Sequence, residues 1–206
     1  MRYYIADNHF LHAKLNEKMD VRGFKDVEEM DNYMINQWNS VVRKNDEIVI
    51  LGDLIWTKNG KIANDIIKQL HGKKYMIIGN HDAYLDDKNF NKSLFASIDQ
   101  YRVFNDDGRK VVCCHYPLLC YEGQYRLDEN GNPKFYMLYG HVHNTADEKY
   151  IQDCIAIGRE RMLDVHHDGT KVQLPYELYN CFSMFSDYKP LTLNQWIEYH
   201  HQKTNI

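Results

Sequence analysis

The chain has 206 residues, 44% of them hydrophobic and 26% charged, which is typical of one globular domain and excludes a disordered chain. The longest aliphatic run, over 48–51, is far too short to cross a membrane, and no secretory segment opens the chain, so we expect one cytoplasmic domain over 1–206. Twenty-five basic residues against 29 acidic ones give a net charge of −4, which disfavours extended contacts with a nucleic acid duplex.

Short apolar runs typical of strands alternate with helical patterns through the first part of the chain. The predicted strands lie at residues 3–5, 47–51, 74–78, 101–104, 110–114 and 135–139. The runs 101–104 and 110–114 flank the turn-forming segment 105–108, which predicts a hairpin.

Two helices are predicted between the first three strands. Asp26 precedes Glu29 in the spacing of a capping box, and apolar residues then recur with the helical period over 27–41. Apolar residues four positions apart predict a second helix over 62–70, with Gly72 as its C-terminal cap.

The last third of the chain is harder to assign. A helical pattern over 150–162 contains Gly158, which weakens it. Thr192 and Gln195 repeat the capping-box spacing and predict a short terminal helix. The stretch 145–179 matches no motif, and we expect the choice of substrate to depend on it.

The order of these elements predicts an α/β fold. Strands apolar on both faces, alternating with helices, form a sheet that helices cover on each side. The hairpin and the later strands extend this sheet into a mixed one or form a second sheet stacked on the first.

Polar side chains directly follow five of the predicted strands. In an open α/β sheet the carboxyl ends of the strands form the edge at which ligands bind. Histidines of a packed core would instead lie within the apolar runs. The residues that follow the strands are Asp7, Asn8, His9, Asp53, Asn80, His81, Asp82, His115, His141 and His143.

These residue types indicate a metal site. Imidazoles and carboxylates with an amide oxygen and no thiolate suit Mn²⁺, Fe²⁺, Zn²⁺, Co²⁺ or Ni²⁺. Two ions ~3.5–4 Å apart need a shared ligand, and the central position of Asp53 in the series makes it the candidate. We expect Gly52, Gly79 and Gly140 to let the backbone turn sharply, so that ligands from different strands can converge.

The polar segments resemble, in order, the motifs DxH, GD, GNH(D/E), a single H and GHxH of the calcineurin-like metallophosphoesterases. The segments 22–24, 27–31, 38–39 and 188–193 are similar to stretches of the small bacterial and phage phosphoesterases of that superfamily. The likeness covers about residues 1–143 and 180–197. It implies a metallophosphoesterase fold, a β-sandwich of mixed sheets flanked by helices.

The resemblance also implies the roles of single residues. Two divalent ions are expected, with Mn²⁺ as the first choice and Fe, Zn, Co or Ni as alternatives. One ion would be held by Asp7, His9, Asp53 and His143, and the other by Asp53, Asn80, His115 and His141.

The implied reaction is hydrolysis of a phosphodiester or phosphomonoester by direct attack of a metal-bridging hydroxide. His81 would be the general acid that protonates the leaving oxygen, and a structural role for this histidine is the alternative. Asp82 would orient that imidazole, or would instead cap the following segment.

Three further residues are candidates for contact with the substrate. Arg22 carries a planar fork suited to phosphate, but an exposed loop position is the alternative, and Gly23 replaces the proline of the family. His12 is a second candidate, with simple solvent exposure as the alternative. Tyr116, directly after His115, is expected near the pocket. The pairs 166–167 and 200–201 are expected in a polar turn and a solvated tail.

Two other functions are alternatives to a phosphoesterase of small phosphorylated substrates. A catalytically silent binding protein of the same fold would lack ligands or the acid histidine, and all are present here. A nuclease would need a cluster of basic residues, so nucleic acid beyond nucleotides is not expected as a partner. A membrane partner is not expected either, and the resemblance admits a homodimer.

Overall fold

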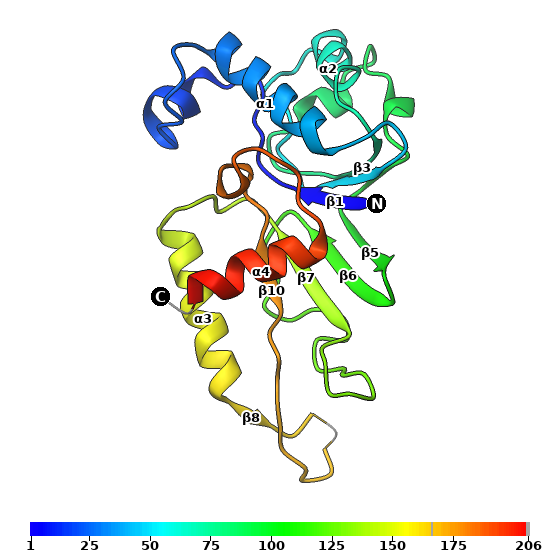
Figure 1. The fold of residues 1–206 in the computed structure, drawn as a ribbon, viewed down its shortest axis with the longest axis vertical. Coiled ribbons are helices and arrows are strands. Elements are labelled where there is room, and N and C mark those ends of the chain that lie inside the picture. The colour runs from blue at the N-terminus through cyan, green and yellow to red at the C-terminus, as the bar shows by residue number, and fades with distance from the viewer. Residues whose placement is uncertain (166, 205–206) are drawn as a thin grey trace.

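The computed structural model describes residues 1–165 and 167–204. Two four-stranded sheets form its centre (Figure 1). The first has the order β1-β2-β3-β4, with all strands parallel, and consists of Arg2–Ile5, Glu47–Ile50, Lys73–Ile77 and Ser97–Asp99.

The second sheet has the order β10-β7-β6-β5 and is mixed. Its strands are β5 (Tyr101–Asp106), β6 (Arg109–Cys114), β7 (Phe135–Tyr139) and β10 (Leu178–Asn180). The strands β6, β7 and β10 are parallel, and only β5 runs antiparallel to its neighbour. A small antiparallel pair, β8 (Met162–Leu163) and β9 (Val172–Gln173), lies apart from both sheets.

Side chains of the two sheets pack face to face and form the central layer of the core. Val49 and Ile77 of the first sheet belong to the same buried cluster as Val111, Cys113 and Leu138 of the second. The sheets therefore form a sandwich, and the predicted α/β fold with stacked sheets is confirmed.

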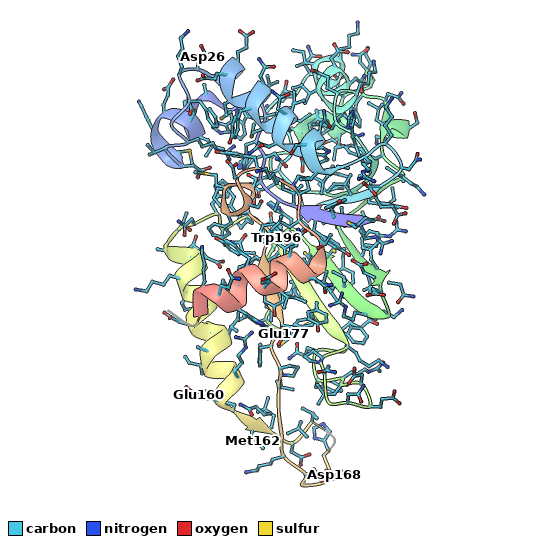
Figure 2. The ribbon with its side chains drawn as sticks, viewed as in Figure 1. Asp26, Glu160, Met162, Asp168, Glu177 and Trp196 are labelled. Atoms are coloured by element: carbon cyan, nitrogen blue, oxygen red, sulfur yellow. The ribbon has the colours of Figure 1, made fainter. Side chains whose placement is uncertain are left out.

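Helices cover the outer faces of this sandwich. α1 (Val27–Val41) and α2 (Gly60–Ile67) pack on the first sheet, where Trp38 and Ile67 share a buried cluster with Ile50. α3 (Ala146–Glu160) covers the second sheet (Figure 1). α4 (Leu193–Thr204) instead packs against the edge strands β1 and β10, and its buried Trp196 (Figure 2) belongs to the cluster between the sheets and donates a hydrogen bond of 3.0 Å to the Tyr4 carbonyl.

The predicted capping box at α4 is complete, and the one at α1 is half formed, because the Glu29 carboxylate bonds the Lys25 amide instead of that of Asp26. The Asp26 carboxylate accepts a hydrogen bond of 2.8 Å from the Glu29 amide at the start of α1 (Figure 2). Thr192 and Gln195 exchange hydrogen bonds of 2.9 and 3.4 Å at the start of α4. The helix predicted over 62–70 instead begins at Gly60 and ends at Ile67, because Asn59 caps it earlier.

Gly72 therefore does not cap α2. Its φ of +92° lies in the turn before β3, and a Cβ there would meet the Val42 side chain. The hairpin turn is also shorter than predicted, because β5 extends to Asp106. Only Asp107 and Gly108 connect the strands, with φ values of 50° and 77° as a tight two-residue turn requires.

The helix predicted over 150–162 is α3, which starts four residues earlier at a Thr145 cap and ends at Glu160. Gly158 lies inside it, and a Cβ at this position would overlap the Tyr176 ring, so the glycine permits close packing. Met162, the last residue of the predicted helix, lies outside α3, is 53% exposed and belongs to β8. Among the described residues, no helix is both long and apolar enough to span a bilayer.

Candidate active site

The loops that follow β1, β2, β3, β6 and β7 meet at one edge of the sandwich. All five strands run parallel within their sheets, so their carboxyl ends open toward this edge. The structure brings together there all seven residues that the sequence predicts as metal ligands. They are Asp7, His9, Asp53, Asn80, His115, His141 and His143.

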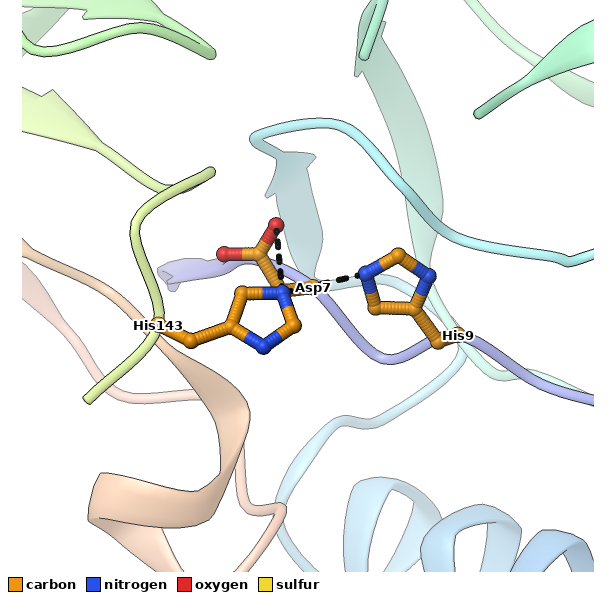
Figure 3. Close-up of side chains that lie close together, drawn as sticks. All are labelled: Asp7, His9 and His143. Carbon is orange, nitrogen blue, oxygen red and sulfur yellow. Dashed lines mark hydrogen bonds and ion pairs between the residues drawn. The ribbon is translucent and has the colours of Figure 1, made fainter. Parts of the chain in front are cut away.

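Asp7, His9 and His143 form a first group, shown in Figure 3. Ligand atoms of these three side chains lie within 4.8 Å of one another. His9 Nε2 is 3.1 Å from His143 Nε2, which is 3.8 Å from Asp7 Oδ1. The spacing is close enough for one cation to contact all three.

A second group lies beside the first. Asp7, Asp53 and His115 again place ligand atoms within 4.8 Å of one another. The Asn80 side-chain oxygen is 3.0 Å from His115 Nε2 and 2.9 Å from His141 Nδ1, which adds an amide oxygen and another imidazole to this group.

Asp7 belongs to both groups, and Asp53 also connects them. The Asp53 Oδ2 atom is 3.5 Å from His9 Nε2 of the first group and 3.7 Å from His115 Nε2 of the second. The other oxygen, Oδ1, accepts a hydrogen bond of 2.8 Å from the His81 amide, which fixes the plane of the carboxylate. A carboxylate in this position can bind two cations at once.

The electrostatics of the site favour a bound cation. Burial raises the pKa of Asp7 to about 8, and the nearby Asp53 carboxylate adds to the rise. Burial also lowers the pKa of His9, so this imidazole is a neutral ligand. Buried carboxylates and neutral imidazoles this close together are costly without a positive charge between them, and the donor set therefore fits divalent cations.

Backbone strain accompanies the ligands. Five of them have a left-handed φ, between 48° and 72°, although none is a glycine. Such conformations cost energy and persist where the surrounding structure holds them, most often at functional sites. The strained ligands are Asp7, His9, Asp53, His141 and His143.

The three glycines of the motifs act in two ways. Gly52 has a φ of +88° and makes the sharp turn that the sequence predicts. Gly79 and Gly140 do not adopt a left-handed φ. A Cβ at Gly79 would overlap the Asp53 carboxylate, and one at Gly140 would overlap that of Asp7, so these glycines allow a close approach instead of a turn.

The Asp82 carboxylate makes backbone contacts that the sequence does not predict. It accepts backbone hydrogen bonds of 2.8 Å from Asp53 and Gly79 and of 2.9 Å from Leu54. It does not cap the short 3₁₀ helix Ala83–Asp86, and no hydrogen bond joins it to the His81 imidazole within the described part of the chain. Asp82 therefore clamps the loops after β2 and β3 together.

Arg22 lies neither at an exposed loop position nor with its guanidinium directed toward a substrate, the two possibilities that the sequence offers. Its side chain is fully buried. The guanidinium donates to the carbonyl oxygens of Asp7 (3.1 Å) and Asn8 (2.6 Å) and pairs with Asp20 at 3.0 Å. These contacts occupy the fork, so in this structure Arg22 supports the loop that carries the ligands and does not face a substrate.

His12 and Tyr116 lie next to the candidate ligands. His12 is 6% exposed, which contradicts the alternative of solvent exposure, and its ring centroid is 5.7 Å from that of His9. Tyr116 is 45% exposed, and its ring centroid is 4.6 Å from that of His141. Both positions agree with the expected proximity to the pocket.

The histidine pairs outside the motifs differ from each other. His200, expected in a solvated tail, lies on α4 with its Nε2 atom 2.9 Å from the Asn180 carbonyl oxygen. Burial lowers its pKa to about 4. In the other pair, His167 is exposed, and His166 lies outside the described residues.

Sequence reasoning missed several residues that hold His143. Asp20 Oδ1 is 2.8 Å from His143 Nδ1, and the Phe182 ring stacks on the imidazole with centroids 4.6 Å apart. The Asn180 amide donates to the His143 carbonyl at 2.9 Å. Asn180 ends β10, so assigning that strand would have marked it as another polar residue at a strand end. No local pattern marks Asp20.

A cavity of about 490 Å³ opens over the candidate ligands. His81 lines it and is only partly buried, so its imidazole can reach a molecule bound there. The other lining residues are His9, His12, Leu15, Met19, Asp20, Asp53, Asn80, His141, Val142, His143, Thr145 and Asp147.

Two known proteins are similar in sequence to this chain. An uncharacterized protein of Methanocaldococcus jannaschii is 34% identical over 148 residues, which cover 71% of this chain and 72% of that protein. The gene 66 protein of Mycobacterium phage L5 is 39% identical over 83 residues, 39% of each chain.

The fold also has a solved relative. The crystal structure of a protein of unknown function from Aquifex aeolicus matches with a TM-score of 0.63 and 23% identity, over 96% of this chain and 98% of that one. The family model described as calcineurin-like phosphoesterase matches residues 3–191. This chain therefore belongs to the calcineurin-like phosphoesterase family.

Proposed function

We propose that the protein is a metal-dependent phosphoesterase that hydrolyses phosphodiester or phosphomonoester bonds of small substrates. The observation that carries the proposal is the position of Asp53, one oxygen of which lies 3.5–3.7 Å from an imidazole of each ligand group. A carboxylate between two such groups is the arrangement that a pair of divalent cations requires.

The residues divide into two overlapping ligand sets. One ion would be held by Asp7, His9, Asp53 and His143, and the other by Asp53, Asn80, His115 and His141. We propose Mn²⁺ as the metal, with Fe, Zn, Co and Ni as alternatives that the same donors accept. When bound, such ions lower the pKa of water and neutralise the charge that develops on phosphoryl oxygens.

Hydrogen bonds from outside the ligand groups orient two of the imidazoles. His115 Nδ1 lies 2.7 Å from the Leu51 carbonyl oxygen, so this nitrogen donates and leaves Nε2 free to face the site. His143 Nδ1 lies 2.8 Å from Asp20 with the same consequence. The chain thereby presents both rings with a lone pair toward the centre.

His81 is the proposed general acid. It lines the cavity, and an imidazole is suited to deliver a proton near neutral pH. Its ring centroid is 5.7 Å from that of His9, so it lies at the border of the ligand groups. We propose that His81 protonates the leaving oxygen of the substrate, and that the neighbouring side chains would hold the cations that bind the phosphoryl group.

The variant Asp53→Asn tests this function. Hydrolysis of bis-p-nitrophenyl phosphate with added Mn²⁺ should fall at least about 100-fold. Losing a residue that only orients a metal ligand costs about 10- to 100-fold, and losing a ligand shared by both ions should cost more. Asp65→Asn, an exposed carboxylate on α2, is the matched control and should keep wild-type activity. An Asp53→Asn protein as active as the wild type would contradict the proposal.

A further inference from the structure

Trp56 places an exposed indole beside the candidate active site. Trp56 is 43% exposed, whereas Trp38 and Trp196 are completely buried. Its ring centroid lies 4.1 Å from that of His12 and 4.6 Å from that of His81, and both histidines line the cavity.

The backbone under this indole is fixed. The Trp56 amide donates a hydrogen bond of 2.8 Å to the Phe10 carbonyl, and Phe10 pairs with Ile55 in a parallel bridge. The segment is therefore attached to the loop that carries His9. A large apolar ring held rigidly in contact with water offers a flat surface on which another ring can stack.

The contact with His81 indicates which part of a substrate Trp56 would meet. A general acid lies next to the leaving oxygen that it protonates. A leaving group attached to that oxygen would extend past His81, and Trp56 is packed against this histidine. Trp56 is not itself among the residues that line the cavity, but its ring packs against His12 and His81, which are, and so it borders the space that the leaving group would occupy.

The charge of the cavity limits the chemistry of that group. The residues that line it in the described part of the chain include no lysine or arginine. Asp20 and Asp147 add carboxylates outside the ligand groups, and Leu15 and Met19 add apolar surface. A second phosphate or a carboxylate on the leaving group would find no cationic side chain, whereas an uncharged ring would find both an apolar wall and hydrogen-bond acceptors.

We propose that Trp56 binds the base of a nucleoside leaving group, so that the substrates of the proposed phosphoesterase are esters of nucleosides. The inference rests on the proposed function, since it takes His81 to mark the leaving-group side. Stacking of a base on an aromatic ring commonly changes affinity by about tenfold or more, and it tolerates different bases.

Two inhibitors that differ only in the base test the proposal. AMP and ribose 5-phosphate carry the same phosphate and sugar, and both can be measured as competitive inhibitors of bis-p-nitrophenyl phosphate hydrolysis. In the wild type, AMP should bind about tenfold more tightly than ribose 5-phosphate. The ratio of the two affinities should approach one in Trp56→Leu and take an intermediate value in Trp56→Phe. It should be unchanged in Tyr150→Leu, which removes an exposed aromatic ring from α3.

Tryptophan fluorescence gives a readout that needs no hydrolysis. Because the other two tryptophans are buried, AMP should quench the emission of the Mn²⁺-loaded protein through Trp56, and ribose 5-phosphate should not. Should no ester be hydrolysed, the function proposed above fails, and a quench by AMP that disappears in Trp56→Leu would still support the base-binding role.

Three results would overturn the inference while leaving the phosphoesterase intact. The first is hydrolysis by the wild type with equal inhibition by AMP and ribose 5-phosphate. The second is a preference for AMP that survives in a folded Trp56→Leu protein. The third is a contribution of Trp56 to the binding of phenyl phosphate that is as large as its contribution to the binding of AMP. That result would assign the indole to simple aryl esters.

Discussion

The His143 imidazole has two nitrogens, and each faces a different carboxylate. Nδ1 is 2.8 Å from Asp20, and Nε2 is 3.8 Å from Asp7 on the opposite side of the ring. Asp20 in turn pairs with the buried guanidinium of Arg22, which donates to the Asp7 backbone. A single chain of contacts therefore sets both the position of Asp7 and the orientation of His143.

Asp20→Asn tests this chain of contacts. An amide can bond either form of the imidazole, so His143 loses the partner that keeps its Nε2 lone pair toward the site, and Mn²⁺ affinity should fall about 10- to 100-fold. Calorimetric titration with Mn²⁺ measures the change. Glu17→Gln changes an exposed carboxylate three residues before Asp20. It is the control and should bind Mn²⁺ as tightly as the wild type does. Equal affinity of Asp20→Asn and the wild type would show that Asp20 does not position the ring.

At the scale of elements, α4 brings a titratable group against the second sheet. The ring of His200 contacts Trp196 and Tyr179, and its Nε2 atom bonds the Asn180 carbonyl at the end of β10. Burial, together with the nearby charge of Lys203, lowers the pKa of His200 to about 4. In the folded protein the ring therefore stays neutral at pH values where the unfolded chain takes up a proton.

This difference makes the packing of α4 sensitive to acid. The unfolded state gains a proton near pH 6.5 and the folded state only near pH 4, so stability falls as the pH drops through this window. Between pH 7 and pH 5 the contribution of His200 is roughly 1–2 kcal/mol. His200→Gln can still donate a hydrogen bond to Asn180. Measured by urea denaturation, the stability that this variant loses between pH 7 and pH 5 should be smaller than the loss in the wild type by that amount. An identical loss in both proteins would exclude His200 as the cause.

Elements defined by local patterns could be predicted from the sequence, and those defined by distant contacts could not. The capping signals of α1 and α4 involve residues three apart, and in both the first residue caps its helix as predicted. Gly158 looks like a helix breaker until the Tyr176 ring, 18 residues away, is seen to pack on it. The clamp made by Asp82 joins two loops whose approach only the folded sheet creates.

At the scale of the whole molecule, the candidate site follows from strand direction. The three strands β1, β2 and β3 of one sheet and β6 and β7 of the other end at the same edge, so polar residues spread from Asp7 to His143 meet there. The order and spacing of these residues could be read from the sequence. Asp20 and Phe182 could not, because they reach His143 from segments without a motif.

The metal content of the purified protein tests this account most directly. After removal of bound metal and reconstitution with Mn²⁺, elemental analysis should find two ions per chain, because Asp53 lies between two complete ligand groups. The Asp53→Asn protein should retain fewer. A folded wild-type chain that holds less than one ion under these conditions would contradict the central claim that these side chains form a pair of cation sites.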